Sequence, residues 1–192
     1  MRIIAGKYRS RPLVAPPGMD TRPTTDRLRE TLFNVLAPRI EGSVWLDLYA
    51  GSGAVGLEAL SRGAAMIHFV ENAKQALRAL EKNIATLGIP EEQVAIQARE
   101  VAKALPILES GGTRYDVCFL DPPYKQPGAY ARTLEFLAES SLLADGAIVI
   151  AEHDKHFSPA AEFGALARYR ELKQGDAVLS FYHRTDSAPH SE

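Results

Sequence analysis

The sequence contains a single cysteine, Cys118, so it can form no internal disulfide and offers no multi-cysteine zinc site. No apolar run approaches the roughly 18 residues that a membrane-spanning helix needs. The first residues, MRIIAGKYRSR, lack the apolar core of a secretory signal. The five histidines show no metal-ligand spacing, so we predict no metal site. Together these absences argue against disulfide-rich secreted and membrane proteins, and we expect a cytoplasmic protein with no membrane partner.

The composition is typical of a globular domain, and its charge is unevenly distributed. The 192 residues are 46% hydrophobic and 24% charged, with a net charge of −2. Residues 1–30 carry seven basic and three acidic side chains, a net charge of +4, so the remainder is acidic. A basic segment on an acidic body favours contact with a polyanion such as RNA, because each neutralised phosphate releases counterions. A solvated leader explains the same charges equally well.

Short apolar runs alternate with helical patterns from residue 44 onward. Strands are predicted at residues 44–49, 66–71, 94–98, 115–121 and 147–152, with a helix after each of the first four. Two further strand-like runs, 166–173 and 177–184, have no helix between them and predict an antiparallel hairpin. We therefore predict an α/β, Rossmann-like fold with a mostly parallel seven-stranded sheet flanked by helices.

The chain is expected to divide into three parts. Residues 1–24 form a basic N-terminal arm, residues 25–185 the main domain and residues 186–192 a loose tail. The main domain begins with a helix that Thr24 or Thr25 can cap and whose apolar face is formed by Leu28, Leu32, Val35 and Leu36. Cys118 is expected in the core. His153 either is structural or lines a cleft.

A glycine-rich turn follows the first predicted strand. Gly51, Gly53 and Gly56 form G-x-G-x-x-G between a strand and a helix, and Glu71 ends the next strand. This pattern is typical of a nucleoside-bearing cofactor, either NAD or S-adenosylmethionine, because a carboxylate at Glu71 can accept hydrogen bonds from ribose hydroxyls. Asp47 favours S-adenosylmethionine, since a carboxylate there would attract an ammonium group and repel a pyrophosphate.

The tetrad Asp121-Pro122-Pro123-Tyr124 ends the fourth strand. The prolines fix the backbone, so the Asp121 carboxylate and the Pro122 carbonyl can face one point and accept both hydrogens of an exocyclic nucleobase amine. Such a grip aims the nitrogen lone pair at an electrophile, for which a sulfonium methyl group is suited. Tyr124 offers a ring on which an unstacked base can rest. The tetrad predicts methyl transfer driven by positioning.

These segments resemble a known family. DLYAGSGAVGLEALSRGA, FVE and FLDPPY are similar to class I S-adenosylmethionine-dependent methyltransferases that modify exocyclic amines. RIIAGKYRSRPL and TRPTTDRLRETLFNVL resemble the RsmD family, which methylates guanine N2 in 16S ribosomal RNA. The resemblance implies a class I methyltransferase acting on a guanine of the position-966 type, within a small ribosomal subunit or an assembly intermediate. We expect a monomer.

The resemblance also implies roles for individual residues. The methionine end of the cofactor would be held by Asp47, Gly51 and Gly53, its ribose by Glu71 and its adenine by Glu100, which stands where the family usually has aspartate. Asp121 and Pro122 would grip the amine and Tyr124 would stack on guanine. Four residues would close over the site: Arg22, Thr24, Thr25 and Arg27. Four others would meet RNA phosphates: Arg2, Lys7, Arg9 and Arg11.

Three other functions remain open on the sequence alone. Adenine N6 methylation of DNA uses the same tetrad, although such enzymes usually carry an added module for reading the duplex. An NAD-dependent oxidoreductase would explain the glycines but neither Asp47 nor the tetrad. A non-catalytic RNA-binding module would explain the basic arm alone.

Overall fold

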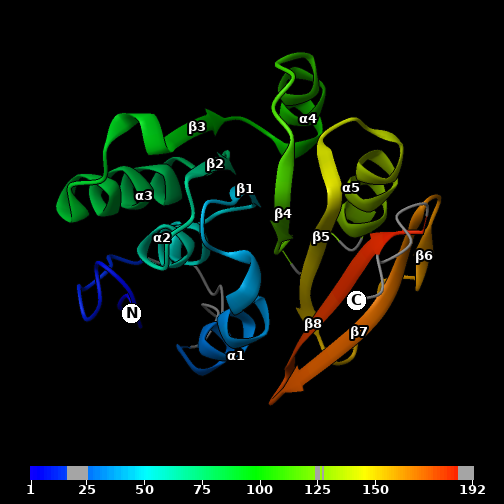
Figure 1. Cartoon of the computed structure of the whole chain (residues 1–192), viewed down its shortest axis with the longest axis horizontal. Coiled ribbons are helices and arrows are strands. Elements are labelled where there is room, and N and C mark those ends of the chain that lie inside the picture. The colour runs from blue at the N-terminus through cyan, green and yellow to red at the C-terminus, as the bar shows by residue number, and fades with distance from the viewer. Residues whose placement is uncertain (17–25, 124–125, 127, 186–192) are drawn as a thin grey trace.

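A computed structural model describes residues 1–16, 26–123, 126 and 128–185. Their strands form one sheet in the order β3-β2-β1-β4-β5-β8-β7-β6 (Figure 1). The strands are β1 (Val44–Leu48), β2 (Met66–Glu71), β3 (Val94–Ala98), β4 (Tyr115–Leu120), β5 (Leu143–Asp154), β6 (Glu162–Phe163), β7 (Leu166–Gln174) and β8 (Ala177–Arg184). Strands β1 to β5 pair in parallel, whereas the β5–β8, β8–β7 and β7–β6 pairs are antiparallel. The predicted fold class is confirmed.

One detail of that prediction is wrong: the sheet in the described residues has eight strands rather than seven. The additional strand, β6, has only two residues and pairs with the start of β7. Two residues are too few to show the alternation of apolar and polar side chains that identifies a strand in a sequence. Its pairing is decided by the turn that brings it against β7.

Helices cover both faces of the sheet. They are α1 (Asp26–Leu36), α2 (Ala54–Ser61), α3 (Lys74–Leu87), α4 (Val101–Ser110) and α5 (Gly128–Glu139), with short 3₁₀ turns at Ala37–Arg39 and Glu91–Gln93. Helices α1, α2 and α3 contribute to one buried cluster and α4 and α5 to the other. None of the helices in the described ranges is long and apolar enough to cross a membrane.

Alternate residues of each central strand belong to opposite faces. Trp45, Phe119 and Ile150 pack with α1, α2 and α3, on what we call the α1-side face, whereas Leu46 and Val149 pack with α4 and α5. Burial of both faces explains why the central strands are almost continuously apolar. Because side chains two residues apart share a face, this alternation also decides which polar side chains meet at the strand ends.

The N-terminal segment packs onto α2 and α3. Ile3, Tyr8 and Leu13 are buried in the core on the α1-side face. The backbone amide of Val14 donates to Asn83 Oδ1 of α3 at 2.8 Å. The predicted boundary at residue 24 lies outside the described residues, as does the predicted tail beyond residue 185, and the three-part division stays a prediction.

The structure bears on two predictions about single residues, and it confirms the one for Cys118. Cys118 is fully buried in the core, where burial raises its pKa above the ordinary range. His153 is buried, and both ring nitrogens have partners: its Nε2 lies 2.9 Å from Ser180 Oγ and its Nδ1 lies 3.0 Å from the Asp154 carbonyl oxygen, which favours the structural alternative.

Candidate active site

The order of the strands places a site beside β1 and β4. Strand β1 lies between β2 and β4, and the chain leaves it toward α2 and later returns from α4 into β4. In open α/β sheets, ligands bind outside the carboxyl ends of the strands where the strand order reverses. The glycine loop follows β1 and Asp121 follows β4, so the two sequence segments lie at the same end of the sheet.

The glycine loop is held by a carboxylate from the neighbouring strand. Glu71 Oε2 accepts a hydrogen bond from the Gly51 amide at 2.8 Å, while its Oε1 accepts from the amides of Asn72 and Ala73, both at 2.8 Å. These bonds fix both the loop after β1 and the turn after β2. Glu71 therefore lies at the end of β2 next to the glycine loop, as the sequence predicted, and both of its carboxylate oxygens accept hydrogen bonds from backbone amides.

Asp47 is buried beneath the same loop. Its Oδ2 accepts a hydrogen bond from the Gly56 amide in the first turn of α2, at 3.0 Å. Burial raises the pKa of Asp47 to about 8; the bond from Gly56 opposes the shift and the charge of Glu71 adds to it. A buried carboxylate that is costly to ionise would be stabilised in its charged form by a cation placed next to it.

The glycines are needed for different steric reasons. Gly53 has a φ of 78°, in the left-handed region, and a Cβ there would lie 2.3 Å from Leu80 Cδ1. At Gly56, a Cβ would lie 2.4 Å from Phe69 Cε1, because α2 packs closely on β2. The loop thus joins a tight turn to a close contact between helix and strand, which is the arrangement that G-x-G-x-x-G supports.

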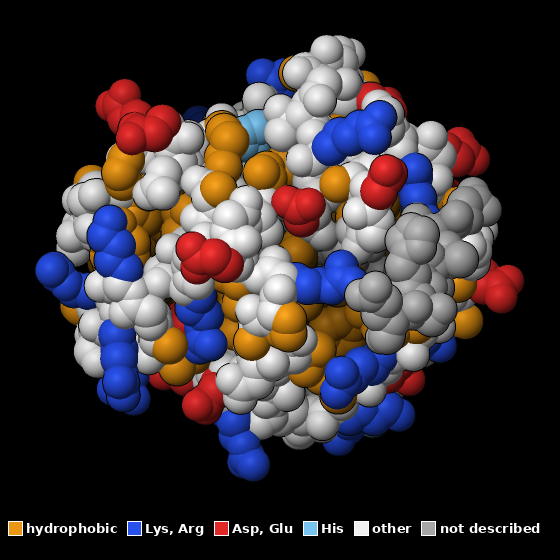
Figure 2. Space-filling view, in the orientation of Figure 1, with side chains coloured by type: hydrophobic (Ala, Val, Ile, Leu, Met, Phe, Trp, Pro, Cys, Tyr) orange, Lys and Arg blue, Asp and Glu red, His pale blue; other side chains and the backbone are white. Residues whose placement is uncertain are grey.

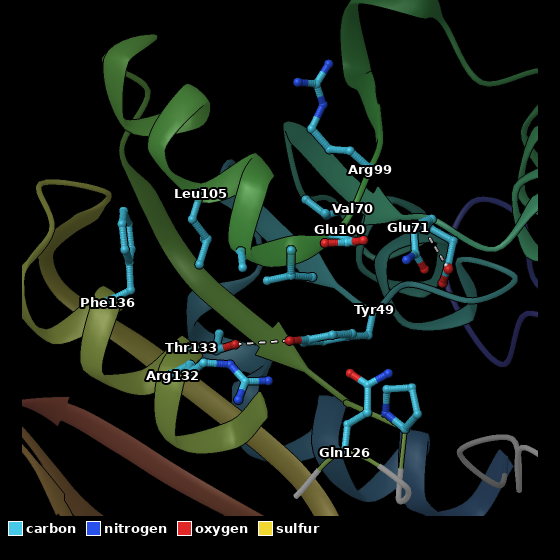
Figure 3. Close-up of a pocket in the computed structure, with 14 residues that line it drawn as sticks. Tyr49, Val70, Glu71, Arg99, Glu100, Leu105, Gln126, Arg132, Thr133 and Phe136 are labelled. Carbon is cyan, nitrogen blue, oxygen red and sulfur yellow. Dashed lines mark hydrogen bonds between the residues drawn. The ribbon is translucent and has the colours of Figure 1, made fainter. Parts of the chain in front are cut away.

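A cavity of about 380 Å³ opens beside the loop (Figure 3). Glu71 lies at one side of it and Leu105 and Phe136 at the other, with Tyr49 and Glu100 between them. This volume is within the range of small-molecule and cofactor sites. Pro123 of the tetrad also lines the cavity, which therefore reaches from the end of β2 to the end of β4.

Several lining residues were missed by the sequence prediction. Tyr49 has a φ of 60°, and its hydroxyl lies 3.1 Å from Thr133 Oγ1 of α5. Arg132 and Phe136 also come from α5. No pattern in the sequence marks these α5 residues, because only the packing of α5 on the sheet brings them to the cavity.

Glu100 lines the cavity and also forms an ion pair with a neighbouring lysine. It precedes α4, and its Oε2 lies 3.1 Å from Lys103 Nζ. Its side chain is 57% exposed, so this ion pair is weak and the carboxylate can reorient. The predicted contact between Glu100 and adenine stays a prediction.

Asp121 lies next to buried acidic side chains. It is half-buried, and its amide donates to the Leu48 carbonyl at 3.4 Å, which ties the end of β4 to β1. Desolvation raises the pKa of Asp121 well above its ordinary value, and the charges of Glu152 and Asp47 raise it further. Pro122 is buried beside it. Tyr124 lies outside the described residues, so its predicted role is a proposal.

Comparison with known proteins shows the family of this chain. The family model described as "Conserved hypothetical protein 95" matches residues 1–183. The "Ribosomal RNA small subunit methyltransferase D" of Escherichia coli (strain K12) is 39% identical over 185 residues, which cover 96% of this chain and 90% of that protein. The protein of the same name from Haemophilus influenzae is 39% identical over 157 residues, 81% of this chain and 79% of its own. This chain belongs to the RsmD family.

Solved structures agree with the fold. The Escherichia coli protein yhhF superimposes with a TM-score of 0.82 and 33% identity, covering 96% of this chain and 97% of its own. SMU.776, solved in complex with SAH, has a TM-score of 0.66 at 14% identity and covers 81% of this chain and 48% of its own. At that identity the second match supports the fold alone.

The residues that were predicted to close over the site in this RsmD chain belong to α1 or to the segment before it. Arg27 of α1 is exposed, whereas Arg22, Thr24 and Thr25 lie outside the described residues. Arg29, which was not predicted as a site residue, is fully buried, and its Nη2 donates to the Arg2 carbonyl and to Asp26 Oδ1, both at 2.7 Å.

The predicted phosphate-binding cations of this RsmD chain are on its surface. Arg2, Lys7, Arg9 and Arg11 are all exposed. Arg2 Nε lies 3.6 Å from Asp26 Oδ2, and Lys7 Nζ lies 5.2 Å from the centre of the Tyr8 ring. Figure 2 shows Lys and Arg side chains along the left and lower margins of the face that it presents. Contact of these residues with RNA stays a prediction.

Proposed function

We propose that this protein transfers a methyl group from S-adenosylmethionine to the exocyclic N2 amine of a guanine in 16S ribosomal RNA, of the position-966 type. The observation that carries the proposal is the placement of Asp121 and Pro122 at the same sheet edge as the glycine loop and its cavity. Family membership supports the substrate class, since relatives of this chain bear the name of small-subunit ribosomal RNA methyltransferases.

The residues at this end of the sheet suit S-adenosylmethionine. Asp47 is a buried carboxylate that a cation would stabilise, which fits the ammonium of the methionine end. We assign that end to Asp47, Gly51 and Gly53, the ribose to Glu71, and the adenine side to the cavity beside Glu100. When bound, the cofactor supplies an electrophilic methyl group. The buried Asp47 does not suit the pyrophosphate of NAD, because two negative charges would then lie together in a desolvated place.

The tetrad would position the amine. The Asp121 carboxylate accepts one amine hydrogen and the Pro122 carbonyl accepts the other, which turns the nitrogen lone pair away from the ring and toward the cavity. Tyr124 would stack on the extruded guanine. The rate gain then comes from alignment of the two reacting atoms in a desolvated site. Phosphates flanking the guanine would meet Arg2, Lys7, Arg9 and Arg11, with Arg27 closer to the base.

The test uses small ribosomal subunits from cells that lack this modification. The protein is incubated with them and with cofactor labelled in the methyl group, and the labelled nucleotide is located by mass spectrometry. We expect N2-methylguanine in 16S ribosomal RNA. Label on adenine, or on DNA alone, would refute the guanine assignment, and calorimetric binding of NAD rather than S-adenosylhomocysteine would refute the cofactor.

A substitution at Asp121 tests whether the tetrad holds the target amine. Asp121→Ala should abolish transfer while leaving the affinity for S-adenosylhomocysteine within a few-fold of wild type. Asp145→Ala is the matched control, because Asp145 is exposed and follows the start of β5 at the opposite end of β4 from Asp121. Full activity of Asp121→Ala would show that the amine is held elsewhere.

A further inference from the structure

Three carboxylates lie together on the α1-side face of the sheet. Phe119 of β4 pairs with Asp47 of β1 and with Ile150 of β5, and Asp121 and Glu152 follow two residues later on the same face. Asp47 and Glu152 are each only 2% exposed. The proposed function gives roles to Asp47 and Asp121, but it leaves the buried Glu152 without one.

Arg29 of α1 brings a positive charge to this face. It is fully buried, and α1 packs against the face through Leu28, Leu32 and Phe33. Among the described residues, Nε and Nη1 of Arg29 have no hydrogen-bond partner, although its Nη2 has two. A buried N–H donor without a partner costs free energy. Because Arg29 holds two such donors at 0% exposure, we expect its side chain to do more than fill space.

We propose that Glu152 and Arg29 are positioning residues that act through Asp121. Glu152 makes the Asp121 carboxylate a stronger proton acceptor, and Arg29 limits this effect so that Asp121 stays ionised when the amine binds. The inference rests on the proposed function, in which Asp121 holds the target amine.

The proton balance of the transfer shows why such tuning is useful. The guanine nitrogen forms a bond to the methyl carbon while the carbon–sulfur bond breaks, and the electron pair of that bond stays on sulfur. The nitrogen is then cationic and must release one proton. Asp121 is the nearest acceptor in the proposed grip, and an ordinary carboxylate is a weak base. A neighbouring negative charge makes it a better base, provided that it is not protonated beforehand.

The charged groups around Asp121 support this balance. Asp47 from β1 and Glu152 from β5 raise the pKa of Asp121 beyond the effect of burial. Arg29 from α1 is desolvated, which lowers its pKa, while the charges of Asp26, Glu58 and Glu152 oppose that shift and Arg62 adds to it. Glu152 thus interacts with both residues: its negative charge attracts Arg29 and repels the Asp121 carboxylate.

The experiment measures the single-turnover methylation rate against pH for the full-length protein on small ribosomal subunits. Activity requires ionised Asp121, so its pKa sets the acidic limb of the profile. Glu152→Gln should move this limb to lower pH, and Arg29→Met should move it to higher pH, each by about one pH unit. The double variant should lie between them, and Arg29→Lys should restore most of the wild-type profile.

Purely structural roles predict a different result. Damage to packing would lower the rate at every pH without moving the limb, or would move both variants in one direction. Either outcome overturns the inference. An acidic limb that does not move in Glu152→Gln also overturns it, and this variant alone is a sufficient test if Arg29→Met fails to fold. Glu135→Gln, at an exposed position of α5, is the control and should leave the profile unchanged. A wild-type protein that transfers no methyl group would instead refute the proposed function.

Discussion

Replacing Glu58 with alanine is expected to release the N-terminal segment from α2 and to destabilise the protein by about 3–5 kcal/mol. The side chain of Glu58 is fully buried. Its carboxylate accepts hydrogen bonds from the amides of Ile4 at 2.7 Å and Ala5 at 3.0 Å, and from Arg62 Nε at 2.7 Å. Hydrogen bonds to a charged group contribute about 1.5–3 kcal/mol each. Water reaches the freed amides once the segment detaches, so the loss stays below the full value of the three bonds.

The measurement is equilibrium unfolding in urea with a parallel thermal scan. For a chain of this size, each kcal/mol corresponds to roughly 2–4 °C in Tm, so a fall of about 10 °C is expected. Glu58→Gln keeps one acceptor oxygen and should lose less stability. Glu81→Ala, at an exposed position of α3, should change it by less than about 0.5 kcal/mol.

A second variant tests the docking of the segment without touching a charge. Gly6 has a φ of 81°, and a Cβ there would lie 1.7 Å from the Ser61 carbonyl oxygen. Gly6→Ala should therefore also release the segment. A loss below about 1 kcal/mol in both Glu58→Ala and Gly6→Ala would refute the conclusion that residues 1–16 are held by α2.

Three further predictions concern other parts of the molecule. Burial raises the pKa of Asp47 to about 8. Its neutral form therefore contributes fully to the free energy of unfolding below about pH 4, and this contribution is lost as the pH rises through 8. The free energy of unfolding of Asp47→Asn, measured between about pH 5 and 9, should lack this decline. Gly56→Ala should cost about 1–3 kcal/mol in urea unfolding, because the new Cβ meets Phe69; a neutral result would contradict the close contact of α2 with β2. Replacing Arg9 and Arg11 with alanine should lower the slope of RNA affinity against salt by about one for each residue, and an unchanged slope would make them ordinary surface charges.

Local patterns were sufficient to predict the order of the elements, except the two-residue strand β6, and the edge of the sheet that carries the candidate site. Gly51 and Glu71 are joined by a hydrogen bond, and the parallel pairing of β1 with β2 brings the glycine turn and this acid to the same end of the sheet. The helix that contains Leu28 and Leu32 was likewise visible from its spacing. The roles assigned to Asp47, Asp121 and Glu100 remain predictions, although the structure brings their backbone positions to one end of the sheet.

The amino-acid sequence by itself determined the alternation of strands and helices, the tight turn after β1 and the fixed Asp121-Pro122 corner, since each depends on residues close together along the chain. Only the tertiary structure decided that Glu58 accepts hydrogen bonds from the amides of Ile4 and Ala5, that Phe136 lines the cavity, and that the buried Arg29 and Glu152 interact. These contacts join residues far apart in sequence. Their energy depends on desolvation and packing, which no local pattern of side chains records.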